Sequence, residues 1–198
     1  MNINVNPWTM EAANLYCGDS ASDANASNHL TLTELKLPGL DLQYVDHRAG
    51  GAPVAIEIDT VIARLECTFS LVGVSPQVMG MLGSWSTQKR VFNAYGVIRD
   101  QVTGQAAQAQ AQLNGQLSKV DPTNWRRGDV MHVAYAIRGI THYELNIAGE
   151  PIFFWDFSTN TRIVGGVDQN KLINGLLQIG GATATPALGG TQGWQDGQ

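Results

Sequence analysis

An alternation of amides and small apolar residues between positions 104 and 120 is the feature that most limits what this chain can form. Ala and Gln both favour helices, but a repeat of two residues is typical of a β-strand, whose successive side chains point to opposite sides. The first parity carries uncharged amides: Gln108, Gln110, Gln112, Asn114 and Gln116. The second parity is apolar: Ala107, Ala109, Ala111, Leu113 and Leu117. We predict a strand with one neutral polar side; the alternatives are a helix, or an ordinary solvated outer side.

The composition predicts one globular domain with a surface suited to association. The chain has 198 residues, of which 43% are hydrophobic and 15% charged, and its net charge is −5. Soluble domains carry about 25% charged residues, so we expect this charge-poor surface to become an interface. The negative charge argues against a phosphate-binding groove, which needs Lys and Arg. We find no pattern of a signal peptide or a membrane span, and expect a protein made in a cytoplasm without a membrane partner.

The extended segments predict a mainly β fold, an antiparallel β-barrel or sandwich with two short helices and a long Gly-rich loop. A hairpin is expected to turn at Ala148 and Gly149. The expected extended segments are 14–18, 29–37, 60–74, 89–100, 105–117, 129–140 and 142–157.

The helices and the chain ends complete the predicted organisation. One helix is expected over 75–85, with Ser75 as its N-cap and Pro76 in its first turn. The second is expected over 168–181, capped by Asp168. Residues 1–13 are expected to form an N-terminal arm, so that 1–181 is one domain and 182–198 is a C-terminal extension.

Residues 41–59 contain two extended pieces around the sequence RAGGAP at 48–53. Gly and Pro interrupt regular structure here, so the segment is expected to be a long flexible hairpin or loop. Its apolar residues after Pro53 would gain contacts only when the segment is ordered.

No pattern of residues indicates catalysis or a cofactor. The chain lacks the nucleophile elbow G-x-S-x-G and the phosphate-binding P-loop, and its four histidines do not have metal-ligand spacing. Every second residue from 153 to 157 is aromatic, so one side of the expected strand carries Phe153, Trp155 and Phe157. This pattern favours packing in the core or in an interface over a sugar-binding platform. We therefore predict no enzyme activity, no metal and no cofactor.

The two cysteines do not form a disulfide scaffold. Cys67 lies on the apolar parity of residues 60–74 and is expected to be buried and inert. Cys17 is placed nearer an edge, where it could be exposed. A disulfide between neighbouring subunits therefore stays open as an alternative.

The order of several segments resembles the major tail tube protein of contractile-tailed phages. The strand pair around DHRAGGAPVAIEID is followed by VIARLECTFSLVGV, which runs directly into SPQVMGMLG. The hairpin HYELNIAGEPIFFWDF and a closing helix after VGGVDQ follow. The resemblance spans about residues 14–181, while the loop 19–28 looks expanded and the tail 182–198 added.

The resemblance implies a structural β-barrel subunit in the virion tail. Such subunits form hexameric rings that stack into a tube inside a contractile sheath. The tube encloses the tape measure protein, meets baseplate and tail terminator proteins at its ends, and lets DNA pass. A tube subunit of a tailocin or a secretion-like injection system is the first alternative, and a carbohydrate-binding β-sandwich is the second.

Three groups of residues have expected roles in such an assembly. Residues 41–59 would stack rings, through Arg48, Gly50, Gly51, Pro53, Val54 and Ile56. Trp194 would anchor the tail on a neighbouring subunit. Strands near 29–37, 54–72, 105–119 and 129–139 would combine across subunits into a closed inner barrel. The lumen-facing residues would be Gln108, Gln110, Gln112, Asn114 and Gln116, whose neutral amides would let DNA slide without specific binding.

Overall fold

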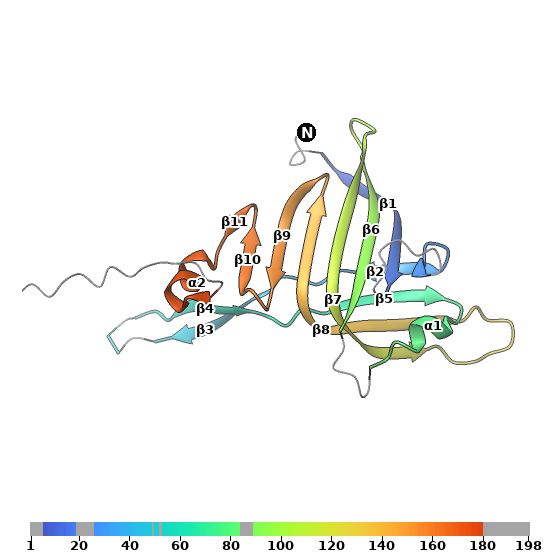
Figure 1. Cartoon of the computed structure of the whole chain (residues 1–198), viewed down its shortest axis with the longest axis horizontal. Coiled ribbons are helices and arrows are strands. Elements are labelled where there is room, and N and C mark those ends of the chain that lie inside the picture. Colours follow the sequence, from blue (N-terminus) through green and yellow to red (C-terminus); the bar gives the residue numbers. More distant parts are fainter. Residues whose placement is uncertain (1–5, 19–25, 49, 52, 84–88, 180–198) are drawn as a thin grey trace, which may run out of the picture.

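The computed structural model describes residues 6–18, 26–48, 50–51, 53–83 and 89–179 (Figure 1). Every strand pair in this part of the chain is antiparallel. The strands are β1 (Trp8–Cys17), β2 (Leu32–Lys36), β3 (Leu42–His47), β4 (Ile56–Ile62), β5 (Cys67–Val72), β6 (Arg90–Asp100), β7 (Ala106–Pro122), β8 (His132–Ile147), β9 (Glu150–Asp156), β10 (Thr161–Val164) and β11 (Val167–Asp168). The helices are α1 (Pro76–Met79) and α2 (Lys171–Leu177).

The main sheet folds into two layers that share β7 and β8. One layer has the strand order β1-β6-β7-β8-β9-β10-β11, and we call it the seven-strand layer. In the other, the C-terminal part of β7 and the N-terminal part of β8 continue into β5 and then β2; we call it the four-strand layer. The strands of the two layers run at a steep angle to each other, upright and horizontal in Figure 1.

Two glycines lie where β7 and β8 pass from one layer to the other. Gly115 is the last β7 residue paired with β6, and a side chain there would collide with Ile137 of β8. Gly139 has a φ of +59°, a conformation that glycine adopts at little cost. The register of β7 against β8 also shifts between Asn114, which pairs with His142, and Gln116, which pairs with Arg138. These features let two long strands belong to both layers.

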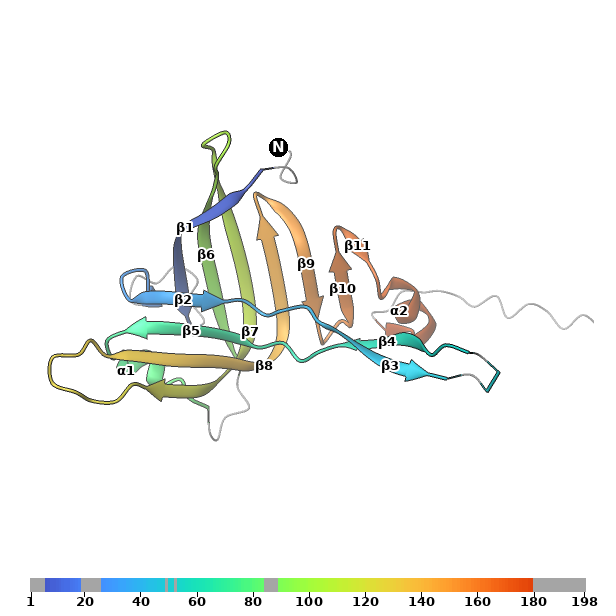
Figure 2. The same cartoon turned by 180° about the vertical axis from the view of Figure 1, so that it is seen from behind.

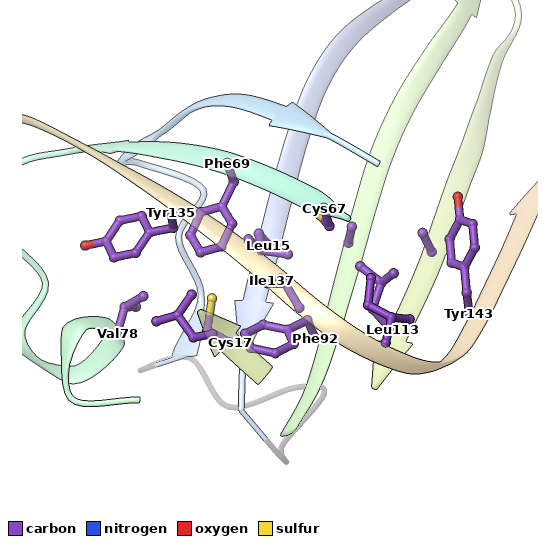
Figure 3. Close-up of a cluster of buried hydrophobic side chains, with 14 of the residues drawn as sticks. Leu15, Cys17, Cys67, Phe69, Val78, Phe92, Leu113, Tyr135, Ile137 and Tyr143 are labelled. Atoms are coloured by element: carbon purple, nitrogen blue, oxygen red, sulfur yellow. The ribbon is translucent and has the colours of Figure 1, made fainter. Parts of the chain in front are cut away.

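The hydrophobic core fills the space between the layers (Figure 3). Phe69 of β5 stacks on Tyr135 of β8, with ring centroids 4.8 Å apart. Other fully buried side chains come from β1, β6 and β7, including Leu15, Phe92 and Leu113. Burial of side chains of this size is the main favourable contribution to folding, at about 25 cal/mol per Å² of apolar surface.

The hairpin of β3 and β4 is a separate two-stranded sheet that projects beyond the main sheet (Figures 1 and 2). All six residues of β3 and all but the last of β4 are exposed. The predicted flexible loop at 41–59 is therefore built largely of two paired strands. The structure describes Gly50, Gly51 and Pro53 at the hairpin's end, but not residues 49 and 52.

The predicted mainly β, antiparallel class with two short helices is confirmed. The described strands form no closed barrel, because β1 and β11 end the seven-strand layer and β2 ends the four-strand layer. One isolated bridge, Tyr16 with Ser27, lies beside β1. A single subunit is thus an open, folded sheet rather than a barrel.

Several predicted boundaries were wrong. The strand expected over 60–74 divides into β4 and β5, and the Ala63 N–H donates to the Asp41 carbonyl within the break. The strands expected over 129–140 and from 142 are one strand, β8. Residues 8–13, expected in an N-terminal arm, belong to β1 and pair with β6.

The predicted turn and first helix cap are confirmed. Ala148 and Gly149 have φ angles of +54° and +83° and connect β8 to β9. The Ser75 hydroxyl accepts a hydrogen bond from the Val78 N–H, although α1 ends at Met79 rather than near 85. The second helix is shorter than expected, and Asn170, not Asp168, is its N-cap.

Candidate assembly surfaces

The exposed hairpin is the most prominent candidate contact surface. It displays large apolar side chains that a soluble monomer usually buries. Val54 is 71% exposed and Ile56 is 58% exposed. Gly50 and Gly51 lack a positive φ, and nothing lies within 4 Å of where their Cβ atoms would be. Neither glycine is therefore needed for a strained turn within the subunit. The expected role of Arg48, Gly50, Gly51, Pro53, Val54 and Ile56 in stacking stays a prediction.

The amide row lies on a β-strand, β7, as predicted, and not on a helix. Ala111, Leu113 and Leu117 are buried, and Ala107 and Ala109 are half-buried, which confirms that this parity packs inward. Gln108 is exposed, whereas Gln110, Gln112, Asn114 and Gln116 are half-buried. The row from Gln108 to Asn114 lies on the outer side of the seven-strand layer. Gln116 lies at the bend, and its side-chain nitrogen donates to the Gly83 carbonyl at 2.6 Å.

Neighbouring strands place charged groups beside the amide row. Glu144 of β8 lies opposite Gln112, and His142 lies opposite Asn114. The His142 ring is 3.1 Å from the Asp156 carboxylate of β9. A hydrogen bond from the Thr159 N–H, helped by His142, lowers the pKa of Asp156 to about 2. The outer side of this layer is therefore not a purely neutral surface.

The four-strand layer has two strand edges without a described β-partner. β2 pairs with β5 on one side only. β7 beyond Leu117 pairs with β8 on one side only, because its pairing with β6 ends at Gly115. An exposed edge presents unpaired N–H and C=O groups and is a template for joining another chain. Among the described residues, β2 and the end of β7 are thus candidate sites for adding strands.

The outer side of the four-strand layer has small residues at its centre and charged residues at its margins, where Glu34 and Lys36 of β2 lie opposite Ser70 and Thr68. Its central residues are Thr68 and Ser70 of β5 and Ala134 of β8, which alternate with buried neighbours. Lys119 and Asp121 of β7 form a surface ion pair of 2.8 Å at one margin. This surface lies on the opposite side of the layer from the core.

Both cysteines are buried within the subunit and free. The expectation that Cys17 could be exposed was wrong: only 1% of it is accessible, because β1 packs on the core. Burial raises the pKa of each thiol to about 12. A disulfide between subunits would require either side chain to leave the core.

The three alternating aromatic residues at 153, 155 and 157 do not form a sugar-binding platform. Phe153 is buried against Tyr143, with ring centroids 5.5 Å apart. Trp155 packs against the core and Phe157 is 70% exposed. In the part of the chain that is described, no cluster of His, Cys, Asp or Glu could hold a metal ion. Nor does any helix there have the length and apolarity to cross a membrane.

Trp194 lies outside the described residues, as does the rest of the tail from residue 180. The structure therefore does not bear on its expected role as an anchor.

A family comparison identifies the class of protein. Residues 20–175 match the family model described as phage tail tube protein FII. The chain belongs to this family. Tail tube proteins are structural, so the chain is a structural protein and not an enzyme.

Solved structures show the same fold at low sequence identity. One is the sheath/tube terminator of an extracellular contractile injection system in its extended state, with a TM-score of 0.51 at 9% identity; the match covers 71% of this chain and 96% of that one. The sheath-tube complex of the same kind of system gives a TM-score of 0.52 at 6% identity, with coverages of 73% and 93%. No curated protein matches.

Sequence reasoning missed the charge pattern of the hairpin. Asp46, Glu57 and Asp59 share one side of it, which follows from the register of β3 against β4. The alternation of charged and apolar residues in IEID at 56–59 could have indicated that Glu57 and Asp59 share a side. The sequence could not indicate which β3 residues lie opposite them, because the register shifts between Gln43 and Tyr44.

Proposed function

We propose that this tail tube protein forms hexameric rings that stack into the conduit of a phage tail. The observation that carries this proposal is the pair of open edges on the four-strand layer, β2 at one margin and the end of β7 at the other. Joining the β2 edge of one copy to the β7 edge of the next would continue the layer from subunit to subunit. In a ring closed in this way, the four-strand layer has no exposed edge.

The strand directions support this joining. The layer runs β7, β8, β5, β2, and each neighbour is antiparallel to the last. Because the layer has four alternating strands, its first strand, β7, and its last, β2, run in opposite directions. Rotating a copy about an axis parallel to the strands leaves these directions unchanged. The β2 of one copy is therefore antiparallel to the β7 of the next. The contact uses two different surfaces, and such contacts close into rings when the rotation permits. The inner barrel would then consist of β2, β5, the part of β7 from Gln116 and the part of β8 up to Arg138, which are only parts of the ranges expected from the sequence.

Rings would become a tube through the hairpin of β3 and β4, which projects from the subunit. The structural relatives are a terminator and a sheath-tube complex. By analogy, we propose a contractile sheath, a tail terminator and a baseplate as partners, a tape measure protein in the lumen, and a location in the virion tail. Trp194 is proposed to anchor the tail on a neighbouring subunit.

Two surfaces compete for the lumen. The sequence favours the amide row as the lumen wall, because neutral amides would bind passing DNA weakly. The edge argument supports the outer side of the four-strand layer instead, since that side of a joined barrel faces its axis while the core lies behind it. The amide row would then point away from the lumen.

A tube that serves an injection system without a genome is the second candidate. It is favoured by the structural relatives, which come from an extracellular contractile injection system. The same ring contacts would serve both, and only the cargo would differ.

Electron microscopy of the purified full-length protein tests the proposal. We expect six-fold rings that stack into tubes as the concentration rises. A monomer that stays dispersed at high concentration would contradict it. Protein that binds glycans on a column as a monomer would support the carbohydrate-binding alternative. Tubes recovered from infected cells, with or without DNA-containing heads, would separate the phage from the injection system.

A further inference from the structure

The hairpin of β3 and β4 has two chemically different sides. Residues directly opposite each other share a side, as do residues two apart on one strand. The register therefore gathers an apolar side and an acidic side. The apolar side carries Val45, His47, Ile56 and Ile58, and the acidic side carries Tyr44, Asp46, Glu57 and Asp59.

Within one subunit this arrangement is unfavourable. A lone two-stranded hairpin is only marginally stable in water. Asp46 lies directly opposite Glu57, and like charges in that position are destabilising. Among the described residues, neither carboxylate has an ion-pair partner. A partner that covers the apolar side and brings positive charge to the acidic side would remove both costs.

Positive charge without a partner lies at the other end of the molecule. The loop 123–131 joins β7 to β8, and it contains Trp125, which is 84% exposed, followed by Arg126 and Arg127. In the described chain neither arginine forms an ion pair. The hairpin and this loop occupy opposite ends of the longest axis of the subunit (Figures 1 and 2).

The loop also has a shape and an apolar content that suit a projecting ribbon. It borders an open hollow of about 680 Å³ whose lining includes Arg126, Asp129, Val130 and His132. Val130 is 65% exposed. Trp125 and Val130 can cover apolar residues, while the two guanidinium groups can pair with carboxylates.

The minority charges on the two elements also have opposite signs. Beside its carboxylates, which include Asp41 at the start of the segment, the hairpin carries Arg48. Beside its arginines, the loop carries Asp129. The hairpin is thus mainly negative with one positive residue, and the loop is mainly positive with one negative residue. Complementary charge patterns of this kind fix the register of a contact.

We infer that the β3–β4 hairpin of one copy docks on the loop 123–131 of a second copy in the next ring, with Asp46, Glu57 and Asp59 facing Arg126 and Arg127. The contact is head to tail, so each copy offers a free hairpin at one end and a free loop at the other. A contact of this kind propagates along one direction. The inference rests on the proposed tube function and names the receiving surface for the hairpin.

Charge reversal on both sides of the contact is the test, in full-length protein at low ionic strength. The variants are Glu57→Lys in β4 and Arg127→Glu in the loop. We expect each to yield rings but to shorten tubes by about tenfold in electron micrographs, because like charges then face each other. The double variant restores opposite charges and should restore long tubes. Glu150→Lys, an exposed position in β9 with the same change of charge, is the control and should form normal tubes.

The outcomes separate this inference from the proposed function. If the unaltered protein forms neither rings nor tubes, the proposed function fails. If it forms tubes that Glu57→Lys and Arg127→Glu leave at normal length, the function stands and the docking inference is overturned. Short tubes from both single variants without restoration in the double variant also overturn it, because the two residues then act at separate contacts.

A crosslink provides a measurement that does not depend on tube length. A chain with Glu57→Cys and Arg127→Cys should give a ladder of disulfide-linked oligomers when tubes are oxidised, while the buried native cysteines stay unreactive. A chain with Glu150→Cys and Arg127→Cys is the matched control and should stay monomeric on a non-reducing gel. A ladder in the control but not in the test variant would also overturn the inference.

Discussion

Gly115 of β7 lies so close to Ile137 of β8 that a Cβ atom at position 115 would be 2.8 Å from the Ile137 Cγ2 atom. The same Cβ would be 3.1 Å from the Arg138 carbonyl oxygen. A backbone oxygen cannot move aside as the end of a flexible side chain can. The strands therefore approach this closely because residue 115 has no side chain, and the two layers depend on that approach.

We expect Gly115→Ala to lower the free energy of unfolding by about 1–3 kcal/mol, the usual cost of inserting a methyl group into a filled site. Urea denaturation of the subunit measures it. Gly51→Ala is the control, since nothing lies within 4 Å of its Cβ position and its φ is not positive; it should change stability by less than about 0.5 kcal/mol. Equal stabilities of the two variants would show that the crossing relaxes freely.

The two cysteines should be unreactive in the folded subunit. Burial raises the pKa of Cys17 and of Cys67 to about 12, so the reactive thiolate is scarce at neutral pH. We expect no labelling by a thiol reagent at pH 8 in the folded protein and two equivalents after unfolding in guanidinium chloride. Subunit dimers on a non-reducing gel of native tubes would contradict this prediction.

Asp100 stabilises the end of β6 as a carboxylate. Burial alone would raise its pKa, but hydrogen bonds from Thr103, Asn6 and Val102 outweigh this effect and lower the pKa to about 2. Because the pKa is lower in the folded state, the stabilisation is present above about pH 4 and is lost as the pH falls through about 2.

We therefore expect Asp100→Asn to be less stable than the unaltered protein at pH 7, with the difference shrinking as the pH approaches 2. Denaturation at a series of pH values measures it. Asp129→Asn, in the exposed loop between β7 and β8, is the control and should show little change at any pH. A difference between Asp100→Asn and the unaltered protein that is constant with pH would mean that the charge of Asp100 is unimportant.

The local pattern of the sequence predicted which residues form strands and which side is buried better than it predicted where a strand bends. The alternation at 107–117 gave the correct inward set, since Ala111, Leu113 and Leu117 are buried. It could not predict the bend, which depends on contacts between Gly115 and residues of β8 that are more than 20 positions away. The strands expected over 129–140 and from 142 are one strand, β8, and the positive φ of Gly139 allows this strand to bend and continue.

The candidate surfaces show the same limit. The exposed segment 41–59 was recognised from its glycines and Pro53, but its pairing into a hairpin gathers acidic residues from two strands. Likewise, the neighbours of the amide row, Glu144 and His142, come from β8. Composition of a single strand carries no information about residues that another strand places beside it.

The lumen can be assigned by labelling assembled tubes. We expect a cysteine introduced as Ala134→Cys, exposed on the four-strand layer, to be protected from a bulky polymer-linked maleimide, because the joined barrel would enclose it. A cysteine introduced as Gln108→Cys, exposed in the amide row, should be labelled. The reverse result would support the amide row as the lumen wall.

In that case Gln110→Lys with Gln112→Lys should leave tubes intact and slow DNA ejection, since lysines bind phosphates.

The hairpin should be dispensable for folding but required for stacking. Its residues from 42 to 61 lie outside the hydrophobic core, and they pair with each other rather than with the main sheet. Deleting residues 48–53 should therefore leave the melting temperature of the subunit within a few degrees of its normal value. The deleted chain keeps both edges of the four-strand layer, so we expect rings in electron micrographs but no tubes. Glu150→Lys, at an exposed position of β9 outside the hairpin, is the control and should stack normally. Tubes of normal length from the deletion would reject the hairpin as the stacking element and, with it, the docking on loop 123–131.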